Sequence, residues 1–508
     1  MALSVIRTRA TIGIDSPLVT IEAHISNGLP GLTLVGLPET TVKEARDRVR
    51  SALLNSGFTY PPKRITVNLA PADLPKEGGR YDLPIAIAVL AASEQISTDK
   101  LQNYEFLGEL ALSGEIRRVM GAIPAALSAK GAGRQLILSS ENSVELAILP
   151  SDEALMAEHL LQVCHFLEGK NTSLSPPLPI KLQTEPSILD MQDIIGQEQA
   201  KRALEITAAG GHNLLLLGPP GTGKTMLASR LCSLLPPLTH QEALEVASIN
   251  SLVGYSMNPQ KWHTRPFRAP HHSSSMAALV GGGSIPRPGE ISLAHNGVLF
   301  LDELPEFNRS VLDALREPLE SGEIVISRAK AKVCFPAQVQ LIAAMNPSPT
   351  GYHQGLHNRS SPQQVLRYLS KLSGPFLDRF DLSIEVPLLP PGILSQSSAK
   401  HGESSHDVKK RVQTARKIQI ERCGCINAVL NSKQTEDICQ LKIEDAVFLE
   451  NTLLKLGLSI RAWHRILKVS RTIADLKEQK RIEKPDIMEA LSYRSMDRLL
   501  IQLQKQAG

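Results

Sequence analysis

The chain has 508 residues, which at the usual ~150 residues each is enough for roughly three domains. Hydrophobic residues make up 42% of the chain and charged residues 21%, as is typical of a soluble globular protein. The 55 basic and 51 acidic residues leave a net charge of +4, so the total charge neither demands nor excludes a nucleic-acid partner. Six cysteines in a chain of this length do not make a disulfide framework.

The N-terminal segment 1–15 contains Arg7 and Arg9 but no apolar signal core behind them. The longest strongly apolar run, 83–92, is too short to span a bilayer and is preceded by Asp82. We therefore expect a reduced, cytoplasmic protein without a membrane partner.

Residues 1–168 alternate between strand-like and helical patterns. The patterns predict strands at 18–23 and 64–69 and helices over 42–55 and 83–92. Stretches rich in Pro and Ser follow at 171–186 and 387–405, and helical patterns then occur at 407–422, 443–456, 459–477 and 485–493. We predict a domain over 1–168, a linker over 169–186, a second domain over 187–386 and a helical region over 387–508.

Residues 218–225 fit the phosphate-binding pattern G-x-x-x-x-G-K-[ST] at every position. An apolar strand pattern precedes them and a helical pattern follows, which is the context that the motif requires. Glycines let backbone N–H groups approach phosphates, while Lys224 would reach the β- and γ-phosphates and Thr225 would ligate Mg²⁺. The alternative is a Gly/Pro-rich turn with a chance lysine. The motif predicts that ATP and Mg²⁺ are held by Gly218, Pro219, Pro220, Gly221, Thr222, Gly223, Lys224 and Thr225.

Two further apolar strand patterns end in polar residues. The run 297–301 ends in Asp302 and Glu303, and the carboxyl ends of parallel strands are where α/β sheets place ligands. We expect Asp302 to act on Mg²⁺ and Glu303 to polarise the attacking water, unless the pair only caps the next helix. The run 340–345 ends in Asn346, which would hydrogen-bond the water or the γ-phosphate, or else begins an Asn-Pro turn.

The segment 193–197 lies upstream of the phosphate-binding motif and before a helical pattern. From this position Ile195 would pack on the adenine of ATP. The segment alone does not establish such a contact.

The order of these motifs resembles that of the AAA+ ATPases. Segment 376–381 resembles the arginine-finger segment of the magnesium-chelatase and MCM-type branch, and 458–462 resembles the second-sensor motif at the start of a lid helix. The resemblance implies that Arg379 reaches the γ-phosphate of a neighbouring subunit and that Arg461 senses the nucleotide. It therefore implies a ring, usually a hexamer. The alternative for the first arginine is a salt bridge to Asp378 or Asp381.

Two unusual segments lie between the phosphate-binding loop and the Asp-Glu strand. Residues 265–275 and 281–295 closely resemble parts of the magnesium-chelatase-like ATPases of the YifB/ComM family, and the resemblance extends over essentially the whole chain. It implies an α/β protein with a Lon-protease-like α+β N-terminal domain, an AAA+ P-loop α/β core and a C-terminal helical lid. Helix-spaced ligand pairs and a cysteine partner are absent, so we favour no metal site at His263, His271, His272 and His295.

The N-terminal domain resembles that of the Lon proteases but lacks their catalytic residues. Lon proteases carry a nucleophilic serine after a segment similar to 75–79, and Arg80 occupies its place here. The segment 107–121 matches the strand pair before the catalytic lysine, whose place falls near Ile123. Arginine cannot attack a carbonyl and isoleucine cannot act as a base, so the resemblance implies a protease fold without its catalytic pair.

The segment 323–335 has a strand–turn–strand pattern with a basic tip. Related ATPases carry a hairpin here that faces the pore of the ring, which makes Arg328, Lys330 and Lys332 candidates for contacts with the DNA backbone. The alternative is an ordinary solvated hairpin tip, which is often Lys-rich.

The remaining metal candidate is Cys423 and Cys425 with a distant third cysteine, Cys439. One Cys-x-Cys pair and a single distant cysteine do not make a four-ligand zinc site. We therefore expect ordinary cysteines.

Members of the ComM branch act as helicases that move branched DNA during natural transformation. The resemblance thus implies an ATP-driven hexameric ring motor on single-stranded or branched DNA, with ATP bound between subunits. The alternative is the ATPase motor subunit of a metal-chelatase complex, although such subunits lack the extra N-terminal domain. A third function, an ATP-dependent protease, is disfavoured by Arg80 and Ile123.

Overall fold

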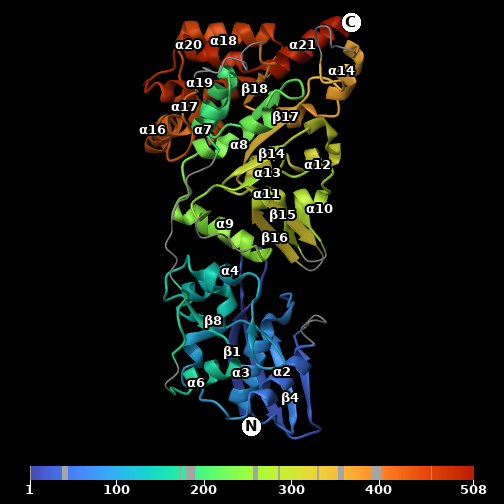
Figure 1. Ribbon diagram of the computed structural model, residues 1–508, viewed down its shortest axis with the longest axis vertical. Coiled ribbons are helices and arrows are strands. Elements are labelled where there is room, and N and C mark those ends of the chain that lie inside the picture. Colours follow the sequence, from blue (N-terminus) through green and yellow to red (C-terminus); the bar gives the residue numbers. More distant parts are fainter. Residues whose placement is uncertain are drawn as a thin grey trace.

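The computed structural model describes residues 2–36, 44–170, 173–178, 189–255, 261–283, 286–328, 331–352, 360–390, 402–458 and 460–507. The molecule is elongated, and its parts follow one another along the long axis in chain order (Figure 1). The N-terminal domain lies at one end, the sheet that carries the phosphate-binding loop in the middle, and the C-terminal helices at the other end. Most of the predicted linker and of the second Pro/Ser-rich stretch lies outside the described residues.

The N-terminal domain is built on a four-stranded sheet in the order β1-β2-β4-β3. Strands β2 and β4 alternate buried and less buried residues because one face of the sheet packs on helices. Every residue of α3 is buried, as the apolar run 83–92 predicts. The elements are β1 (Ala2–Arg9), β2 (Leu18–Ser26), β3 (Gly31–Val35), β4 (Arg64–Ala70), α2 (Ala45–Asn55) and α3 (Asp82–Ala92).

A second, parallel sheet completes this domain in the order β5-β8-β9. Three helices and a short antiparallel strand pair accompany it. The elements are β5 (Tyr104–Phe106), β6 (Glu109–Leu110), β7 (Ile116–Arg117), α4 (Ala122–Gly131), β8 (Gln135–Ser139), α5 (Ser143–Leu146), β9 (Ala154–Ala157) and α6 (Leu160–Leu167).

The central part is a five-stranded parallel sheet in the order β11-β14-β17-β10-β18. Strands β10, β14 and β17 are buried throughout, because helices cover both faces of the sheet. The ends of β10, β14 and β17 therefore meet at one edge. The strands are β10 (Leu214–Leu217), β11 (Phe267–Arg268), β14 (Val298–Leu301), β17 (Gln340–Met345) and β18 (Leu382–Glu385).

Alternate residues of the central strand point to opposite faces. Leu214 and Leu216 pack against α7 (Glu198–Gly210) and α8 (Lys224–Leu234). Leu215 and Leu217 belong to a separate apolar cluster on the other face. That cluster includes residues of α11 (Glu290–Leu293), α12 (Arg309–Ala314), α14 (Pro362–Leu369) and α21 (Ser495–Ala507).

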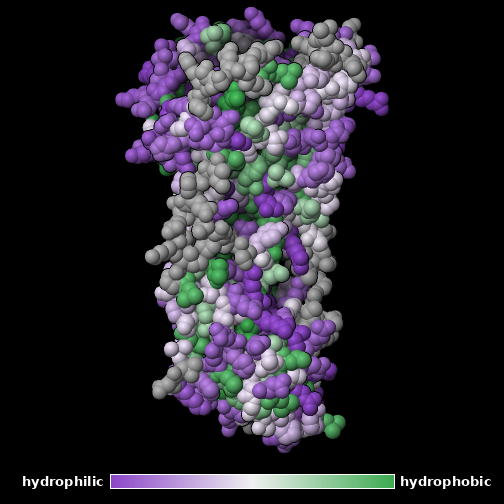
Figure 2. All heavy atoms as spheres, viewed as in Figure 1, coloured by the Kyte–Doolittle hydropathy of each residue, from purple (hydrophilic) through white to green (hydrophobic). Residues whose placement is uncertain are grey.

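The C-terminal region is helical. Helices α16 (Ser405–Cys423), α18 (Ile443–Lys455), α19 (Ile460–Leu476) and α20 (Lys484–Ser492) confirm the four predicted helices. Two helices were not predicted, α17 (Ser432–Ile438) and α21. Hydrophilic side chains gather over this end of the molecule on the face shown in Figure 2. Within the described ranges, no helix has the length and apolarity needed to cross a membrane.

The N-terminal domain and the central part share a hydrophobic cluster. It joins residues of α4 to residues of α9 (His240–Leu252) and surrounds the buried ring of Trp262. Polar contacts border it, since the hydroxyl of Ser251 donates to the carboxylate of Glu145 and the Ser251 carbonyl accepts from the Gly121 amide at 3.0 Å. The two parts therefore pack directly on each other.

Candidate nucleotide-binding site

The loop 218–225 connects the end of β10 to the start of α8. Gly221 and Gly223 have φ angles of +79° and +85°, a backbone conformation that glycine adopts without a steric penalty. At Gly218 an added Cβ would lie 2.3 Å from the carbonyl oxygen of Val386, so this position also requires glycine. The loop is thus shaped as a cradle of backbone N–H groups at a helix N-terminus, which favours a phosphate group.

Lys224 is buried at the first turn of α8, and its ammonium group contacts oxygens of its own chain. Nζ donates to the carbonyl oxygens of Gly218 and Pro219 at 2.8 Å and to Oδ1 of Asn346 at 3.2 Å. Burial lowers the pKa of Lys224, and the charge of Asp302 opposes that shift. Phosphate oxygens offer the same acceptor chemistry, so they can replace these contacts.

Thr225 and Asp302 meet at the same edge of the sheet. The hydroxyl of Thr225 donates to Oδ2 of Asp302 at 2.7 Å. A hydroxyl and a carboxylate oxygen are ligands that fit Mg²⁺, which is usually held by one or two such groups together with water and phosphate. These two residues would therefore hold the ion, whose chemistry is to neutralise phosphate charge.

Glu303 has a positive φ angle of +51°, which is uncommon for a residue other than glycine. Its amide donates to Oδ1 of Asp302 at 2.9 Å, and its Oε2 lies 3.0 Å from Nδ1 of His272. The ring of His271 lies against that of His272, with centroids 4.1 Å apart. The carboxylate of Glu303 is therefore positioned by a histidine that follows the neighbouring strand β11.

The pocket at this edge of the sheet has a volume of about 450 Å³ and is lined by 220–226 together with Asp302, Glu303, Met345 and Asn346. The structure thus brings residues 220–225 of the predicted phosphate loop together with both polar strand ends. The role of His272 was not predicted, because it depends on two strands distant in sequence. A histidine four residues after a strand that neighbours the Asp-Glu strand is the signal that points to it.

Five residues predicted for the nucleotide site do not line this pocket. Gly218 and Pro219 begin the phosphate loop, and the other three are Ile195, Arg379 and Arg461. Ile195 is 39% exposed, and the loop that carries it contacts the segment after β18, where Gln197 donates to the Pro387 carbonyl at 2.7 Å. Arg461 is exposed in the first turn of α19. Arg379 precedes β18, and its carbonyl accepts a hydrogen bond from the side chain of Asn213 at 2.8 Å.

Arg379 and the phosphate loop lie at opposite ends of β10, which follows Asn213 and rises about 13 Å over its four residues. Nη2 of Arg379 lies 2.5 Å from Oε2 of Glu320. The predicted alternative, a salt bridge to Asp378 or Asp381, is wrong. Those carboxylates contact other basic groups, Arg465 at 3.4 Å and His212 at 3.5 Å.

The predicted basic hairpin is confirmed as β15 (Glu323–Arg328) paired with β16 (Ala331–Pro336). Arg328 is the last residue of β15 and Lys332 is exposed on β16, while Lys330 lies outside the described residues. The hairpin base is buried, since Ile324 and Phe335 belong to an apolar cluster of the central part. The hairpin is thus anchored at its base.

None of the six cysteines forms a disulfide. The Sγ atoms of Cys423 and Cys425 are 3.8 Å apart, and burial raises the pKa of the Cys439 thiol to about 12. Among the described residues, no group of three or more His, Cys, Asp or Glu side chains is placed to hold a metal ion.

Three family models match this chain. "Magnesium chelatase, subunit ChlI" matches residues 190–393, "Subunit ChlI of Mg-chelatase" matches 21–142, and "Magnesium chelatase, subunit ChlI C-terminal" matches 402–494. The intervals between the matched ranges, 143–189 and 394–401, contain the whole predicted linker and part of the second Pro/Ser-rich stretch. The boundaries at 168, 186 and 386 stay predictions.

Two of the relatives match almost the full chain, and a third matches part of it. The protein YifB of Salmonella typhimurium is 61% identical over 505 residues, which cover 99% of each chain. "Competence protein ComM" of Haemophilus influenzae is 61% identical over 510 residues, again 99% of each chain. The "Magnesium-chelatase 38 kDa subunit" of Rhodobacter capsulatus is 29% identical over 226 residues, which cover 40% of this chain and 57% of its own.

Proposed function

This chain belongs to the YifB/ComM family of magnesium-chelatase-like ATPases, and from that premise we propose that it is a ring-forming motor that couples ATP hydrolysis to movement on DNA. The family implies ATPase activity. The observation that supports the proposal most is the convergence of Lys224, Thr225, Asp302, Glu303 and Asn346 on one pocket. Each of these side chains has the chemistry that nucleotide hydrolysis needs.

In the proposed reaction, the N–H groups of the phosphate loop and Lys224 bind the phosphates of ATP. Thr225 and Asp302 hold Mg²⁺. Glu303 accepts the proton of the attacking water, and the contact with His272 orients its carboxylate before ATP binds. Asn346 gives up its contact with Lys224 and becomes free to hold the γ-phosphate or the water.

We further propose that the site is completed by a second subunit. The position of Arg379 at the far end of β10 supports this, because its guanidinium is remote from the phosphate loop of its own chain. The Glu320 carboxylate that contacts Arg379 is 69% exposed, so the pair can separate when a neighbouring subunit approaches. The expected assembly is a hexameric ring, with Arg461 acting on the nucleotide through the helical region.

DNA is the proposed substrate of the movement. Lys332 is exposed near the tip of an anchored hairpin, which suits a contact that positions the phosphate backbone without reading sequence. The name of the Haemophilus influenzae relative, a competence protein, supports a role in natural transformation. We infer that the substrate is single-stranded or branched DNA and that the activity promotes branch migration.

The proposal is tested by measuring the ATPase rate of the purified protein with and without forked DNA, and the binding of that DNA at increasing salt. We expect DNA to stimulate the ATPase, and we expect binding to weaken with salt because phosphate contacts release counterions. Lys332→Ala should reduce the stimulation, whereas Lys433→Ala, at an exposed lysine of α17, should not. No stimulation together with no salt-sensitive DNA binding would contradict the proposal.

A second candidate function is the motor subunit of a metal-chelatase complex. The similarity to the magnesium-chelatase subunit of Rhodobacter capsulatus favours it, although that similarity covers only 40% of this chain. The two functions predict different activators of the ATPase. Stimulation of the ATPase by a large tetrapyrrole-binding protein, and not by DNA, would favour the chelatase function.

A further inference from the structure

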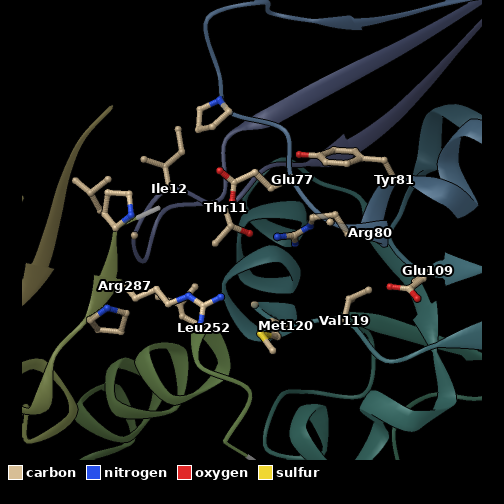
Figure 3. A pocket seen from close by; sticks show the side chains of 18 of the residues that line it. Thr11, Ile12, Glu77, Arg80, Tyr81, Glu109, Val119, Met120, Leu252 and Arg287 are labelled. Carbon is tan, nitrogen blue, oxygen red and sulfur yellow. The ribbon is translucent and has the colours of Figure 1, made fainter. Parts of the chain in front are cut away.

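A second pocket lies between the N-terminal domain and the central part of the molecule. Its volume is about 480 Å³, similar to that of the pocket at the phosphate loop. Thr11 and Arg80 line it from the N-terminal domain, and Arg287 lines it from β13 (Arg287–Pro288) of the central part (Figure 3). Nothing in the proposed ATPase chemistry uses this pocket.

Arg80 lies in a short helix, η1 (Gly79–Tyr81), and brings unpaired donors to the pocket. Its Nε and Nη2 atoms are buried and have no hydrogen-bond partner among the described residues. Burial lowers the pKa of this guanidinium, and the charge of Tyr81 opposes that shift. The hydroxyl of Thr11 is also buried and has no hydrogen-bond partner within the described part of the chain. Unpaired buried donors of this kind are costly, and a bound anion would relieve the cost.

Arg287 supplies a further cation from the opposite wall. Figure 3 shows the guanidinium groups of Arg80 and Arg287 directed into the same space from different sides. Arg118 also lines the pocket, but its Nη2 lies 3.4 Å from a carboxylate oxygen of Glu145 and from the carbonyl of Gly254. Arg80, Arg287 and Thr11 therefore supply donors that face the pocket.

Buried hydrogen bonds hold the loop that carries Arg80. Lys76 is fully buried, and its ammonium group donates to the carbonyl oxygens of Gly36 and Leu74 at 3.1 Å and to that of Pro71. At Gly79 an added Cβ would lie 2.4 Å from Oε2 of Glu109, so a larger residue before Arg80 would require the Glu109 side chain to move. The arginine is thus presented by a fixed backbone.

We propose that this interdomain pocket binds the phosphate group of a nucleotide-sized ligand. Guanidinium groups that approach from different walls, together with a hydroxyl, match the tetrahedral oxygens of a phosphate better than the two coplanar oxygens of a carboxylate. Glu77 and Glu109 line the same pocket, and Oε1 of Glu109 lies 4.0 Å from Nη1 of Arg117. A ligand with hydroxyl or amino donors beside its phosphate, as a nucleotide has, suits this mixture of charges.

The ligand would connect the two parts of the molecule. Val333 and Phe335 of the basic hairpin line the pocket, and an added Cβ at Gly13 would lie 2.6 Å from the Val333 side chain. A ligand bound in the pocket would therefore lie next to the base of the hairpin. This inference concerns a site separate from the ATP pocket and holds whether or not the protein moves on DNA.

The test uses the full-length protein carrying Lys224→Ala, which removes phosphate binding at the first pocket. Calorimetric titrations with inorganic phosphate, a deoxynucleoside 5′-monophosphate and a short single-stranded oligonucleotide report binding at the remaining site. Arg287→Ala is the main variant because Arg287 is exposed and its loss should not disturb folding. Arg80→Gln is the second variant, and Arg309→Ala, at an exposed arginine of α12, is the matched control.

We expect at least one probe to bind, with a dissociation constant that rises tenfold or more in Arg287→Ala and in Arg80→Gln but stays unchanged in Arg309→Ala. If the pocket variants lose affinity only for the monophosphate, the ligand is a free nucleotide. If they lose affinity only for the oligonucleotide, the ligand is a DNA strand. If no probe binds, or if both pocket variants bind every probe within twofold of the parent protein, the proposal is overturned.

Discussion

The pocket at the phosphate loop and the interdomain pocket differ in whether their cationic side chains already have hydrogen-bond partners. At the phosphate loop, the ammonium of Lys224 and the hydroxyl of Thr225 are already satisfied by oxygens of the same chain. In the interdomain pocket, Nε and Nη2 of Arg80 have no partner within the part of the chain that the structure describes. The first pocket can exchange internal contacts for those of a ligand, so it suits repeated binding and release. The second gains contacts that it otherwise lacks, which suits a ligand that stays bound.

The largest expected effect concerns Arg379, the arginine that we propose a neighbouring subunit supplies to the first pocket. Arg379→Ala should lower the ATP turnover number by about 10³-fold or more, because an arginine supplied in trans contributes about 10³–10⁵ in other NTPases. ATP affinity, measured by titration, should stay largely intact. Glu320→Ala is the control, since it removes the contact partner of Arg379 and keeps the arginine. A loss of ATP binding with no separate loss of turnover would instead indicate a structural ion pair.

The next effect tests the chemistry inside the first pocket. Glu303→Gln should keep ATP binding and lower turnover by about 10²–10⁴-fold, the usual contribution of a general base. It should also trap the ring that we propose, which a mass measurement in the presence of ATP would detect. Turnover within a few-fold of the wild type would remove Glu303 from the role that we assign to it.

A third prediction compares two buried lysines. Lys76→Met should lower the free energy of unfolding by roughly 2–4 kcal/mol, because it leaves the carbonyls of Gly36, Pro71 and Leu74 without their donor. Lys224→Met should cost less than about 1 kcal/mol, since water in the open pocket replaces its contacts. Denaturant unfolding of both variants checks this, and equal losses would contradict the contrast.

The smallest expected effect tests whether the interdomain pocket contributes to ATP turnover. Arg287→Ala should leave the basal ATPase rate within twofold of the wild type, because Arg287 does not line the ATP pocket. The measurement is a steady-state assay at saturating ATP without DNA. A large decrease in turnover would show that the interdomain pocket supports catalysis directly.

Much of the first pocket could be predicted from the sequence, because its parts are encoded locally. The phosphate loop follows an apolar strand, and Asp302, Glu303 and Asn346 each end an apolar run, so the topology of a parallel sheet brings them together. Helices with long apolar runs, such as α3, could be predicted for the same reason.

The remaining contacts could not be predicted, because they join segments that the sequence does not link by any pattern. The partner of Arg379 is 59 residues away, and the contact of His272 with Glu303 depends on the register of β11 and β14. The interdomain pocket needs Arg80 and Arg287 to converge from separate domains. Ile195 illustrates the opposite case, in which a local motif alone does not bring a side chain into the pocket lining.

The central claim, that this ATPase moves DNA, is tested most directly by a four-way DNA junction with one labelled arm. We predict that the wild-type protein converts the junction into branch-migrated products in the presence of ATP and that Glu303→Gln binds the junction without converting it. Failure of the wild-type protein to convert the junction, under conditions in which it hydrolyses ATP and binds the DNA, would contradict the claim.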